Sequence, residues 1–232
     1  MEDKSKICYS IANSIVSMMP EGCPYPEWSK DSFLRSLQNN ARILDVGCGN
    51  NSPRFTKDIV PSCYYIGLDV GDYNQGDDNP ADEYVISSSE KFVSTIYKYA
   101  DSVDAVISTH NIEHCDDRYG VVEAMAKSLN VGGKAYLSFP CADSVSFPNR
   151  VGTLNYFDDG SHVGDPPDFG KVISILVESG LSIVFASSRF QPPIHWILGL
   201  GNEEQSAKDG DLKEGIWCYW GFESIIVAER KK

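Results

Sequence analysis

The chain has 232 residues, of which 42% are hydrophobic and 11% aromatic, which suits one α/β domain with additional segments better than two independent domains. Its formal net charge of -13 disfavours binding to long nucleic acids or membrane surfaces, because phosphate groups would be repelled. The seven cysteines form no CxxC pair, which favours free thiols in a reducing compartment, and no apolar run reaches membrane-spanning length. The composition therefore predicts a cytoplasmic protein that does not bind membranes.

The first segment predicts an amphipathic helix that ends before Pro20. Ile7, Ile11, Ile15 and Met18 recur on one helical face, which we expect to be the buried face. This helix and the segment "PEGCPYPEWSK" form a predicted amino-terminal cap, residues 1–40, which we expect to cover a ligand.

From residue 41 onward, short apolar runs alternate with amphipathic segments, which predicts a mostly parallel sheet with helices on both faces. The predicted strands are "ARILDVG", "CYYIGLDV", "EYVISS", "VDAVIST", "GKAYLSFP", "LSIVFASS" and "FESIIVAER". Helices are predicted in "RYGVVEAMAKSLN" and "DFGKVISILVESG". The acidic segment 71–83 reads as a solvated connection. The long segment 141–167 and an insertion at about 191–216 interrupt the domain, residues 41–232, and the insertion is either a specificity lid or a tolerated addition.

The stretch "ILDVGCGNNSPRF" has half of a nucleotide-binding fingerprint. A strand that ends at Asp45 and runs into Gly47 and Gly49 lets the backbone turn sharply and approach a ligand. Asp69 ends the next predicted strand, where a carboxylate can accept hydrogen bonds from two ribose hydroxyls. Together these residues predict a bound nucleoside.

The turn after Gly49 lacks the third glycine of a dinucleotide site. Ser52 is predicted to cap the following helix with Pro53 at its first position, and Asn51 can take a turn conformation. No basic residue lies in the turn, so the loop has no design for a diphosphate.

In combination, "ILDVGCGNNS", "YIGLDV", "VDAVISTHNIEHCDD" and "NVGGKAYLSFP" resemble the motifs of the class I S-adenosylmethionine-dependent methyltransferases. The resemblance covers residues 41–190 and the final strand. It implies a Rossmann-like, doubly wound α/β sheet of seven strands whose last strand is antiparallel, with S-adenosyl-L-methionine across the carboxyl ends of the first strands. The cofactor-binding residues that we expect on this basis are Asp45, Gly47, Cys48, Gly49, Asn51, Asp69, Val70, Ser88, Ser89 and Thr109.

The fourth predicted strand leads into "THNIEHCDD", where His110, Glu113 and His114 share one face if a helical turn begins there. Imidazole and carboxylate groups suit a divalent metal ion. By resemblance to the small-RNA 2'-O-methyltransferases, His162 in "DDGSHVGD" would complete such a metal site. Three readings stay open: an unmetalled pocket in which His110, His114 or His162 is a general base, a metal site, or capping and core packing.

The sequence thus predicts an S-adenosylmethionine-dependent methyltransferase that acts on a small-molecule acceptor, most simply at the oxygen of a sugar, phenol or other metabolite hydroxyl. A divalent-metal-dependent O-methyltransferase for vicinal oxygens is an alternative. Outside this class, an NAD-dependent oxidoreductase would share the sheet and Asp69, although the missing glycine counts against it. A non-catalytic cofactor-binding protein would keep the loop without the chemistry.

Overall fold

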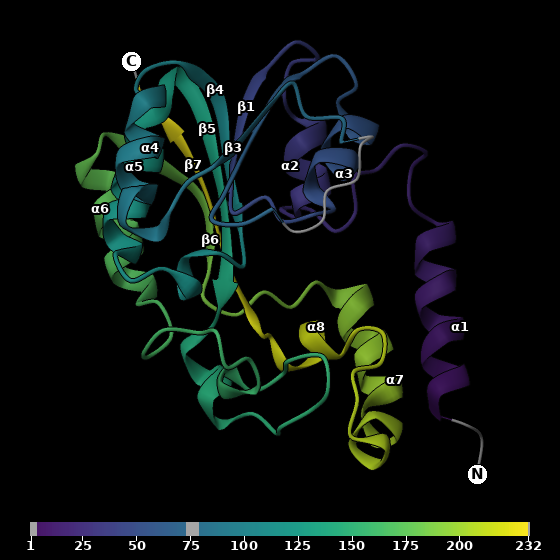
Figure 1. Cartoon of the computed structure of the whole chain (residues 1–232). Helices are drawn as coiled ribbons and strands as arrows, with labels where there is room; N and C mark the ends of the chain where they lie inside the picture. The colour runs from purple at the N-terminus through teal and green to yellow at the C-terminus, as the bar shows by residue number, and fades with distance from the viewer. Residues whose placement is uncertain (1–3, 73–78, 232) are drawn as a thin grey trace.

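The computed structural model describes residues 4–72 and 79–231, and its centre is a single mixed sheet (Figure 1). The strand order is β3-β2-β1-β4-β5-β7-β6, in which β7 is antiparallel to β5 and β6 and the other pairs are parallel. The strands are β1 (Arg42–Val46), β2 (Tyr64–Asp69), β3 (Glu83–Ile86), β4 (Val103–Thr109), β5 (Leu129–Pro140), β6 (Leu181–Ser187) and β7 (Glu223–Arg230). The predicted seven-stranded Rossmann-like sheet with an antiparallel last strand is confirmed.

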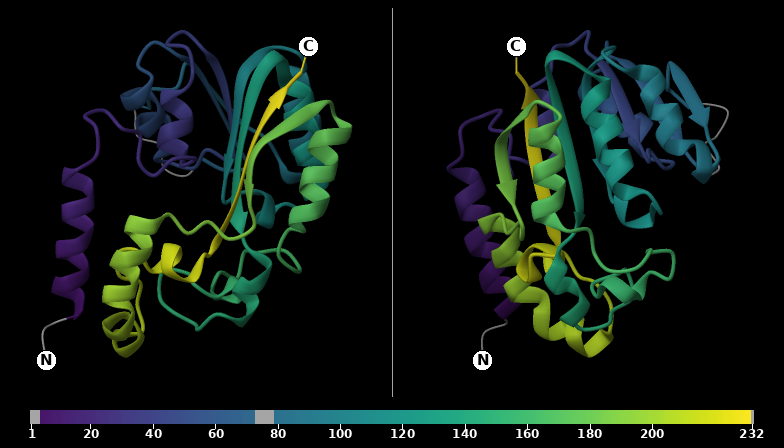
Figure 2. Two further views of the ribbon diagram at one scale, coloured as in Figure 1. Left: turned by 180° about the vertical axis from the view of Figure 1, so that it is seen from behind. Right: turned by 90° about the vertical axis from the view of Figure 1, so that its left-hand side faces the viewer.

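Helices cover both faces of this sheet, with α2 and α3 on one side and α4, α5 and α6 on the other (Figures 1 and 2). The helices are α1 (Lys4–Ser17), α2 (Lys30–Arg35), α3 (Ser52–Ile59), α4 (Phe92–Ile96), α5 (Arg118–Ser128), α6 (Phe169–Glu178), α7 (Pro193–Asp209) and α8 (Ile216–Trp220). Both helices predicted within the domain are present as α5 and α6, although α5 ends at Ser128 because β5 begins at the next residue. Residues 73–78 of the acidic connection lie outside the described residues.

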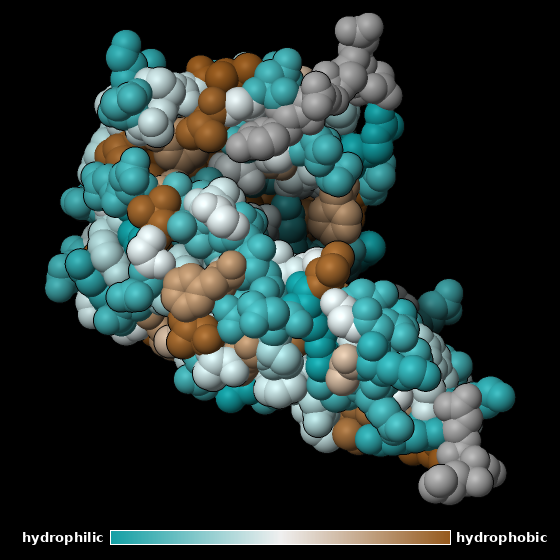
Figure 3. Space-filling model, turned by 60° about the horizontal axis from the view of Figure 1, so that its bottom comes forward, coloured by the Kyte–Doolittle hydropathy of each residue, from teal (hydrophilic) through white to brown (hydrophobic). Residues whose placement is uncertain are grey.

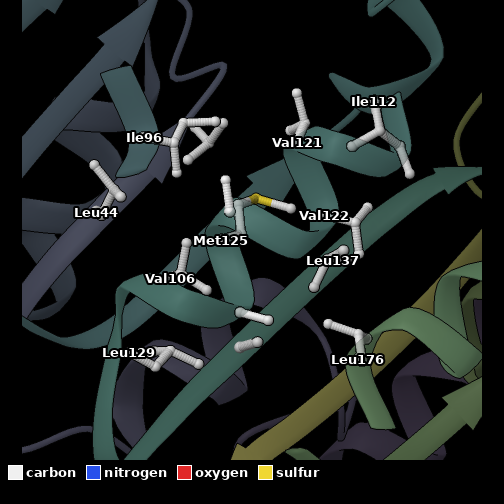
Figure 4. Close-up of a cluster of buried hydrophobic side chains, with 14 of the residues drawn as sticks. Leu44, Ile96, Val106, Ile112, Val121, Val122, Met125, Leu129, Leu137 and Leu176 are labelled. Carbon is white, nitrogen blue, oxygen red and sulfur yellow. The ribbon is translucent and has the colours of Figure 1, made fainter. Parts of the chain in front are cut away.

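The main hydrophobic core lies between the sheet and α5 (Figure 4). Val121, Val122 and Met125 of α5 pack against strand residues such as Val106 and Leu137, and all are essentially fully buried. Each such side chain contributes about 1.5–3 kcal/mol when removed from water. This packing fixes β1, β4 and β5 relative to one another, and with them the loops that leave their carboxyl ends.

Those carboxyl ends face α7, α8 and the segment 141–168, which lie beyond one edge of the sheet (Figure 1). Figure 3 brings this edge forward and shows a notch between the part that carries α2 and α3 and the part that carries α7. The face of the molecule that Figure 3 shows is largely hydrophilic, with hydrophobic residues scattered over it. In an open parallel sheet, ligands bind at this edge.

The amino-terminal helix α1 lies beside α7 in every view (Figures 1 and 2). Its predicted buried face is correct only at Ile15, which packs against the cluster of Ala12; Cys8 and Ala12 are buried, while Ile7 and Ile11 are 42% and 46% exposed. The cause is Gly201 on α7, where a Cβ would lie only 2.7 Å from the Cys8 Cβ. Small residues on both helices allow a close approach that isoleucine would prevent.

The predicted insertion at 191–216 is largely the helix α7, which extends from Pro193 to Asp209. Gly199 of α7 meets the backbone of Gly215, which precedes α8, at a place where a Cβ would lie 2.2 Å from the Gly215 carbonyl oxygen. The helix therefore holds α1 on one side and α8 on the other. Among the helices of the described residues, none combines the length and apolar character needed to cross a bilayer.

Candidate functional site

The loop after β1 turns at Gly47, whose φ of +78° lies in the left-handed region. A Cβ at this position would lie 2.3 Å from Cγ of Asn111, so the Asn111 side chain fills the space that glycine leaves. Gly49 also has a positive φ, +53°, but a Cβ there would meet no atom within 4 Å. The first glycine therefore serves internal packing, whereas the second leaves open space beside the loop.

Asp69 at the end of β2 holds this loop by accepting hydrogen bonds from two backbone N–H groups. The Gly49 N–H donates to Oδ2 at 2.8 Å and the Val70 N–H donates to Oδ1 at 2.7 Å. Burial raises the pKa of Asp69, although these hydrogen bonds act in the opposite direction. Each carboxylate oxygen retains a further lone pair.

Asp45, at 0% exposure, is the acceptor of a second polar cluster at the end of β1. Its Oδ2 accepts hydrogen bonds from the Ser52 and Tyr65 hydroxyl groups and lies 3.5 Å from the Lys30 ammonium nitrogen. The predicted role of Ser52 as a helix cap is wrong, because Ser52 is itself the first residue of α3 and its hydroxyl donates to Asp45. Asn51 precedes the helix without a side-chain capping bond.

Two hollows flank Asp69 at the carboxyl edge of the sheet. We call the first the glycine groove; it has a volume of about 410 Å³ and is lined by Lys30, Gly47, Cys48, Gly49, Asn50, Asn51, Ser52, Phe55, Thr109 and His110. The second, the Phe92 pocket, has about 320 Å³ and is lined by Val70, Ser89, Glu90, Phe92, Val93, His114, Cys115, Asp116, Asp117 and Val121. Both hollows combine polar and apolar side chains, with Lys30 as a cation in the groove and with Phe92, Val93 and Val121 as apolar walls in the pocket.

Most residues expected to bind a cofactor meet at these two hollows. Gly47, Gly49, Asn51 and Thr109 line the glycine groove, and so does Cys48, whose buried sulfur packs toward Gly67. Val70 and Ser89 line the Phe92 pocket. Ser88 is exposed, precedes a short 3-10 turn and lines neither hollow. Burial raises the pKa of the Cys48 thiol, which therefore stays protonated.

His110 follows β4 in a strained backbone conformation, with a φ of +48°. Its ring Nδ1 lies 3.1 Å from Glu113 Oε1 and its Nε2 lies 2.8 Å from Glu223 Oε1. Burial acts to lower the pKa of His110, but the two carboxylates outweigh it and raise the pKa to about 10. His110 is therefore an imidazolium at neutral pH, with both ring nitrogens occupied.

His114 and His162 face each other, with ring centroids 4.8 Å apart. His162 Nδ1 lies 2.6 Å from the Tyr156 carbonyl oxygen, which can only accept, so Nδ1 carries the proton. His114 Nδ1 lies 3.0 Å from Ser161 Oγ, whose hydroxyl donates to Asp159, and 3.3 Å from the Ser161 carbonyl oxygen. We therefore assign the proton of both rings to Nδ1, which leaves a lone pair on each Nε2.

Glu113 joins these two histidines in a compact group of ligand atoms that lie within 4.8 Å of one another. The structure brings together three of the four residues expected at a metal site, whereas both ring nitrogens of His110 contact carboxylates. Glu113 is fully buried, and its Oε2 has no hydrogen-bond partner among the described residues.

A third hollow, the histidine pocket, lies beside the other two. It has a volume of about 200 Å³ and is lined by His110, Glu113, His114, Gly152, Thr153, Asp159, His162, Trp217 and Phe222. It shares His110 with the glycine groove and His114 with the Phe92 pocket. The histidine pocket therefore adjoins both other hollows at the carboxyl ends of the strands.

Sequence reasoning missed Lys30, Glu223 and Asn111, which come from different parts of the chain. No periodicity or motif marks them, because each acts through a contact with a residue distant in sequence. The ring centroid of Trp217 lies 5.1 Å from that of His110. Asp159 reaches His114 through Ser161.

Comparison with known proteins gives a match to one family over part of the chain. The family described as "Methyltransferase domain" matches residues 44–137, which run from within β1 to within β5 and include the glycine loop. No curated protein matches the chain in sequence.

Several solved structures share the fold. An S-adenosylmethionine-dependent methyltransferase from Mesorhizobium loti is 18% identical over 85% of this chain and 96% of its own, with a TM-score of 0.57. A proposed methyltransferase, in a complex with the Trm112 methyltransferase activator of Haloferax volcanii, is 12% identical over 100% and 99%, with a TM-score of 0.59. A geranyl diphosphate methyltransferase in complex with SAM is 16% identical over 86% and 84%, with a TM-score of 0.54.

Proposed function

We propose that the chain is a class I S-adenosylmethionine-dependent methyltransferase, because a methyltransferase family model matches its first five strands and solved methyltransferases share its fold, and that it methylates a hydroxyl group of a small acceptor in the histidine pocket. The observation that supports this most strongly is the pair of imidazole Nε2 lone pairs offered by His114 and His162 in a pocket that adjoins the glycine groove. Such a group can accept the proton that the hydroxyl must lose.

The residues at the two hollows beside Asp69 fit the cofactor. In this proposal the apolar walls of Phe92 and Val121 hold the adenine, and the remaining lone pairs of Asp69 accept from the ribose hydroxyls. The glycine groove, which Lys30 and Asn51 line, then holds the amino-acid half. Bound S-adenosylmethionine supplies a methyl carbon whose bond to a positively charged sulfur breaks as the acceptor oxygen bonds to it.

The chain's own contribution is to position the acceptor and remove its proton. His162 is the first candidate for the base, because its Nδ1–H is fixed on the Tyr156 carbonyl and directs Nε2 into the pocket. His114 is held in a comparable way through Ser161 and Asp159. The sulfonium needs no further activation, so orientation of the acceptor oxygen dominates the rate enhancement.

His110 has a different role from the other two in this proposal. An imidazolium with both nitrogens bonded to carboxylates cannot accept a proton, so His110 orients Glu113 and closes the wall between groove and pocket. Its ring is stacked on Phe222, with centroids 6.0 Å apart.

The size and charge of the histidine pocket favour a small, uncharged acceptor. Its volume of about 200 Å³ is below the usual range for drug-sized ligands. Glu113 and Asp159 line it, so a carboxylate or phosphate group on the acceptor would be repelled. Phenols and other small hydroxyl compounds satisfy both conditions.

We also propose a division of the chain that assigns the acceptor side to its later segments. Residues 1–40 form the amino-terminal cap and residues 41–232 the methyltransferase domain. The insertion at about 191–216 supports the acceptor pocket, because α7 packs against α8, which carries Trp217.

Release of S-adenosylhomocysteine during incubation with S-adenosylmethionine and a panel of small phenols, catechols, sugars and amines tests the proposal. We expect turnover with hydroxyl compounds that depends on His162. Turnover with amines alone would contradict methylation at oxygen.

A second candidate is a divalent-metal-dependent reaction on two adjacent oxygens. The unpartnered, buried Glu113 Oε2 favours it, because a buried carboxylate oxygen without a partner is costly unless a cation or donor meets it. Glu113, His114 and His162 would hold the ion, with the Tyr156 carbonyl orienting one imidazole from behind. The ion would lower the pKa of the acceptor hydroxyl.

Metal analysis of the purified protein and calorimetric titration with Zn²⁺ and Mn²⁺ separate the two candidates. If the metal reaction is correct, one equivalent binds, a chelator abolishes turnover, and Glu113→Gln removes both. Metal-independent turnover of the untreated protein would contradict it and leave the histidine base.

A further inference from the structure

Lys30 lines the glycine groove although it belongs to the amino-terminal cap, outside the part of the chain that matches the family. Its side chain is 17% exposed, and its Nζ donates to Ser52 Oγ and lies 3.5 Å from Asp45 Oδ2. An ammonium group has three N–H donors. Asp45 and Ser52 therefore hold a partly buried cation at the rim of the groove, and its ammonium group keeps an N–H donor for a ligand.

Residues on either side of Lys30 contact the sheet and so fix the position of Lys30. Trp28 stacks on Phe185 of β6 with ring centroids 4.8 Å apart and an interplanar angle of 2°. Phe33 packs on Tyr136 of β5, with ring centroids 5.4 Å apart. The Ser29 side chain accepts from the Ser32 N–H and fixes the start of α2 at Lys30. Lys30 is therefore anchored on both sides rather than carried on a free arm.

The charge of the glycine groove explains what such a cation can recognise. His110, the other cation that lines the groove among the described residues, is neutralised through both nitrogens by Glu113 and Glu223. Asp45 faces Lys30 but is fully buried. Of these two cations, Lys30 is the one that still has an N–H donor to offer. An anion that enters the groove therefore binds at Lys30.

We propose that Lys30 binds the α-carboxylate of the amino-acid half of S-adenosylmethionine and so makes the site select S-adenosylmethionine over its decarboxylated analogue. This inference rests on the proposed orientation of the cofactor, with the nucleoside at Asp69 and the amino-acid half in the glycine groove. Lys30 is a specificity-determining residue in this account, and Asp45 and Ser52 orient its ammonium group.

Calorimetry with three ligands tests this directly: S-adenosylmethionine, decarboxylated S-adenosylmethionine, and 5'-methylthioadenosine, which lacks the whole amino-acid chain. The wild-type protein should bind S-adenosylmethionine about 10- to 100-fold more tightly than the decarboxylated analogue, the range expected for a charged hydrogen bond. Lys30→Gln, which keeps a donor for Ser52, should remove most of that difference. Lys30→Arg should retain part of it, and the affinity for 5'-methylthioadenosine should be the same in all three proteins.

Two results would overturn the assignment. One is a wild-type protein that binds both sulfonium ligands equally, a comparison that needs no variant. The other is a Lys30→Gln protein that loses the same factor of affinity for both, because Lys30 would then only neutralise Asp45. Failure of the proposed function gives a different outcome, in which the wild-type protein binds S-adenosylmethionine but transfers no methyl group to hydroxyl acceptors.

Discussion

His110 and Glu223 are joined by a contact of 2.8 Å between Nε2 and Oε1, although they lie 113 residues apart in the chain. The contact connects the end of β4 to the first residue of β7, the antiparallel strand. With Glu113 on the other nitrogen, it fixes an imidazolium between two carboxylates at the wall of the histidine pocket. The pocket therefore depends on the way β7 returns through the sheet.

This pair makes stability depend on pH in a defined direction. The pKa of His110 is about 10 in the folded protein and about 6.5 in the unfolded chain, so the folded state binds more protons between these values. The stabilisation is complete below pH 6.5 and is lost as the pH rises through 10. We expect the free energy of unfolding, measured in urea from pH 6 to 10, to fall more steeply for the wild type than for His110→Gln. Parallel pH profiles of the two proteins would contradict the raised pKa.

His162→Ala should reduce turnover by about 100- to 10,000-fold, the usual contribution of a positioned base, while the affinity for S-adenosylhomocysteine stays unchanged. His114→Ala should behave similarly but less severely, since its ring is held through a serine rather than directly by a carbonyl. His195→Gln is a matched control, because His195 stacks on Tyr25, away from the histidine pocket. Full turnover in His162→Ala would remove that residue from the mechanism.

Asp69→Asn should weaken S-adenosylhomocysteine binding by about 10- to 100-fold, measured by calorimetry. An amide offers one oxygen, whereas the carboxylate accepts from both Gly49 and Val70, so one backbone N–H would face an NH₂ group. Asp58→Asn, an exposed change on α3, should leave the affinity intact. Equal affinities of the Asp69→Asn and wild-type proteins would exclude Asp69 from the cofactor site.

Gly47→Ala and Gly49→Ala should differ in cost although both positions have a positive φ. Both variants carry the left-handed strain of about 1–2 kcal/mol, but only the first places a Cβ against Asn111. Urea unfolding should therefore show the larger loss for Gly47→Ala, and adding Asn111→Ala should recover part of it. A Gly49→Ala protein that is the less stable of the two would contradict this distinction.

The sheet could be predicted from sequence because its strands are short apolar runs separated by amphipathic helices, and because the glycine loop and Asp69 end neighbouring strands. The buried face of α1 could not be predicted in the same way. Periodicity pointed to Ile7 and Ile11, but the partner helix offers Gly201, and close backbone packing selects Cys8 and Ala12 instead. Such a choice depends on the partner and is absent from the helix's own pattern.

The candidate site shows the same division between local and distant information. "HNIEH" placed three polar residues together, but it gave no sign that the His110 ring would contact Glu223 and lie outside the group formed by Glu113, His114 and His162. Likewise the sequence around Ser52 is typical of a helix cap, yet the Ser52 hydroxyl donates a hydrogen bond to the buried Asp45 carboxylate. Both outcomes arise from carboxylates that need partners and lie elsewhere in the chain.

The most direct test is calorimetric titration of the purified protein with S-adenosylhomocysteine, and separately with NAD. The account predicts one S-adenosylhomocysteine bound per chain, with affinity that falls in Asp69→Asn and persists in His162→Ala, and no binding of NAD. Absence of S-adenosylhomocysteine binding, or binding that is indifferent to Asp69, would contradict it.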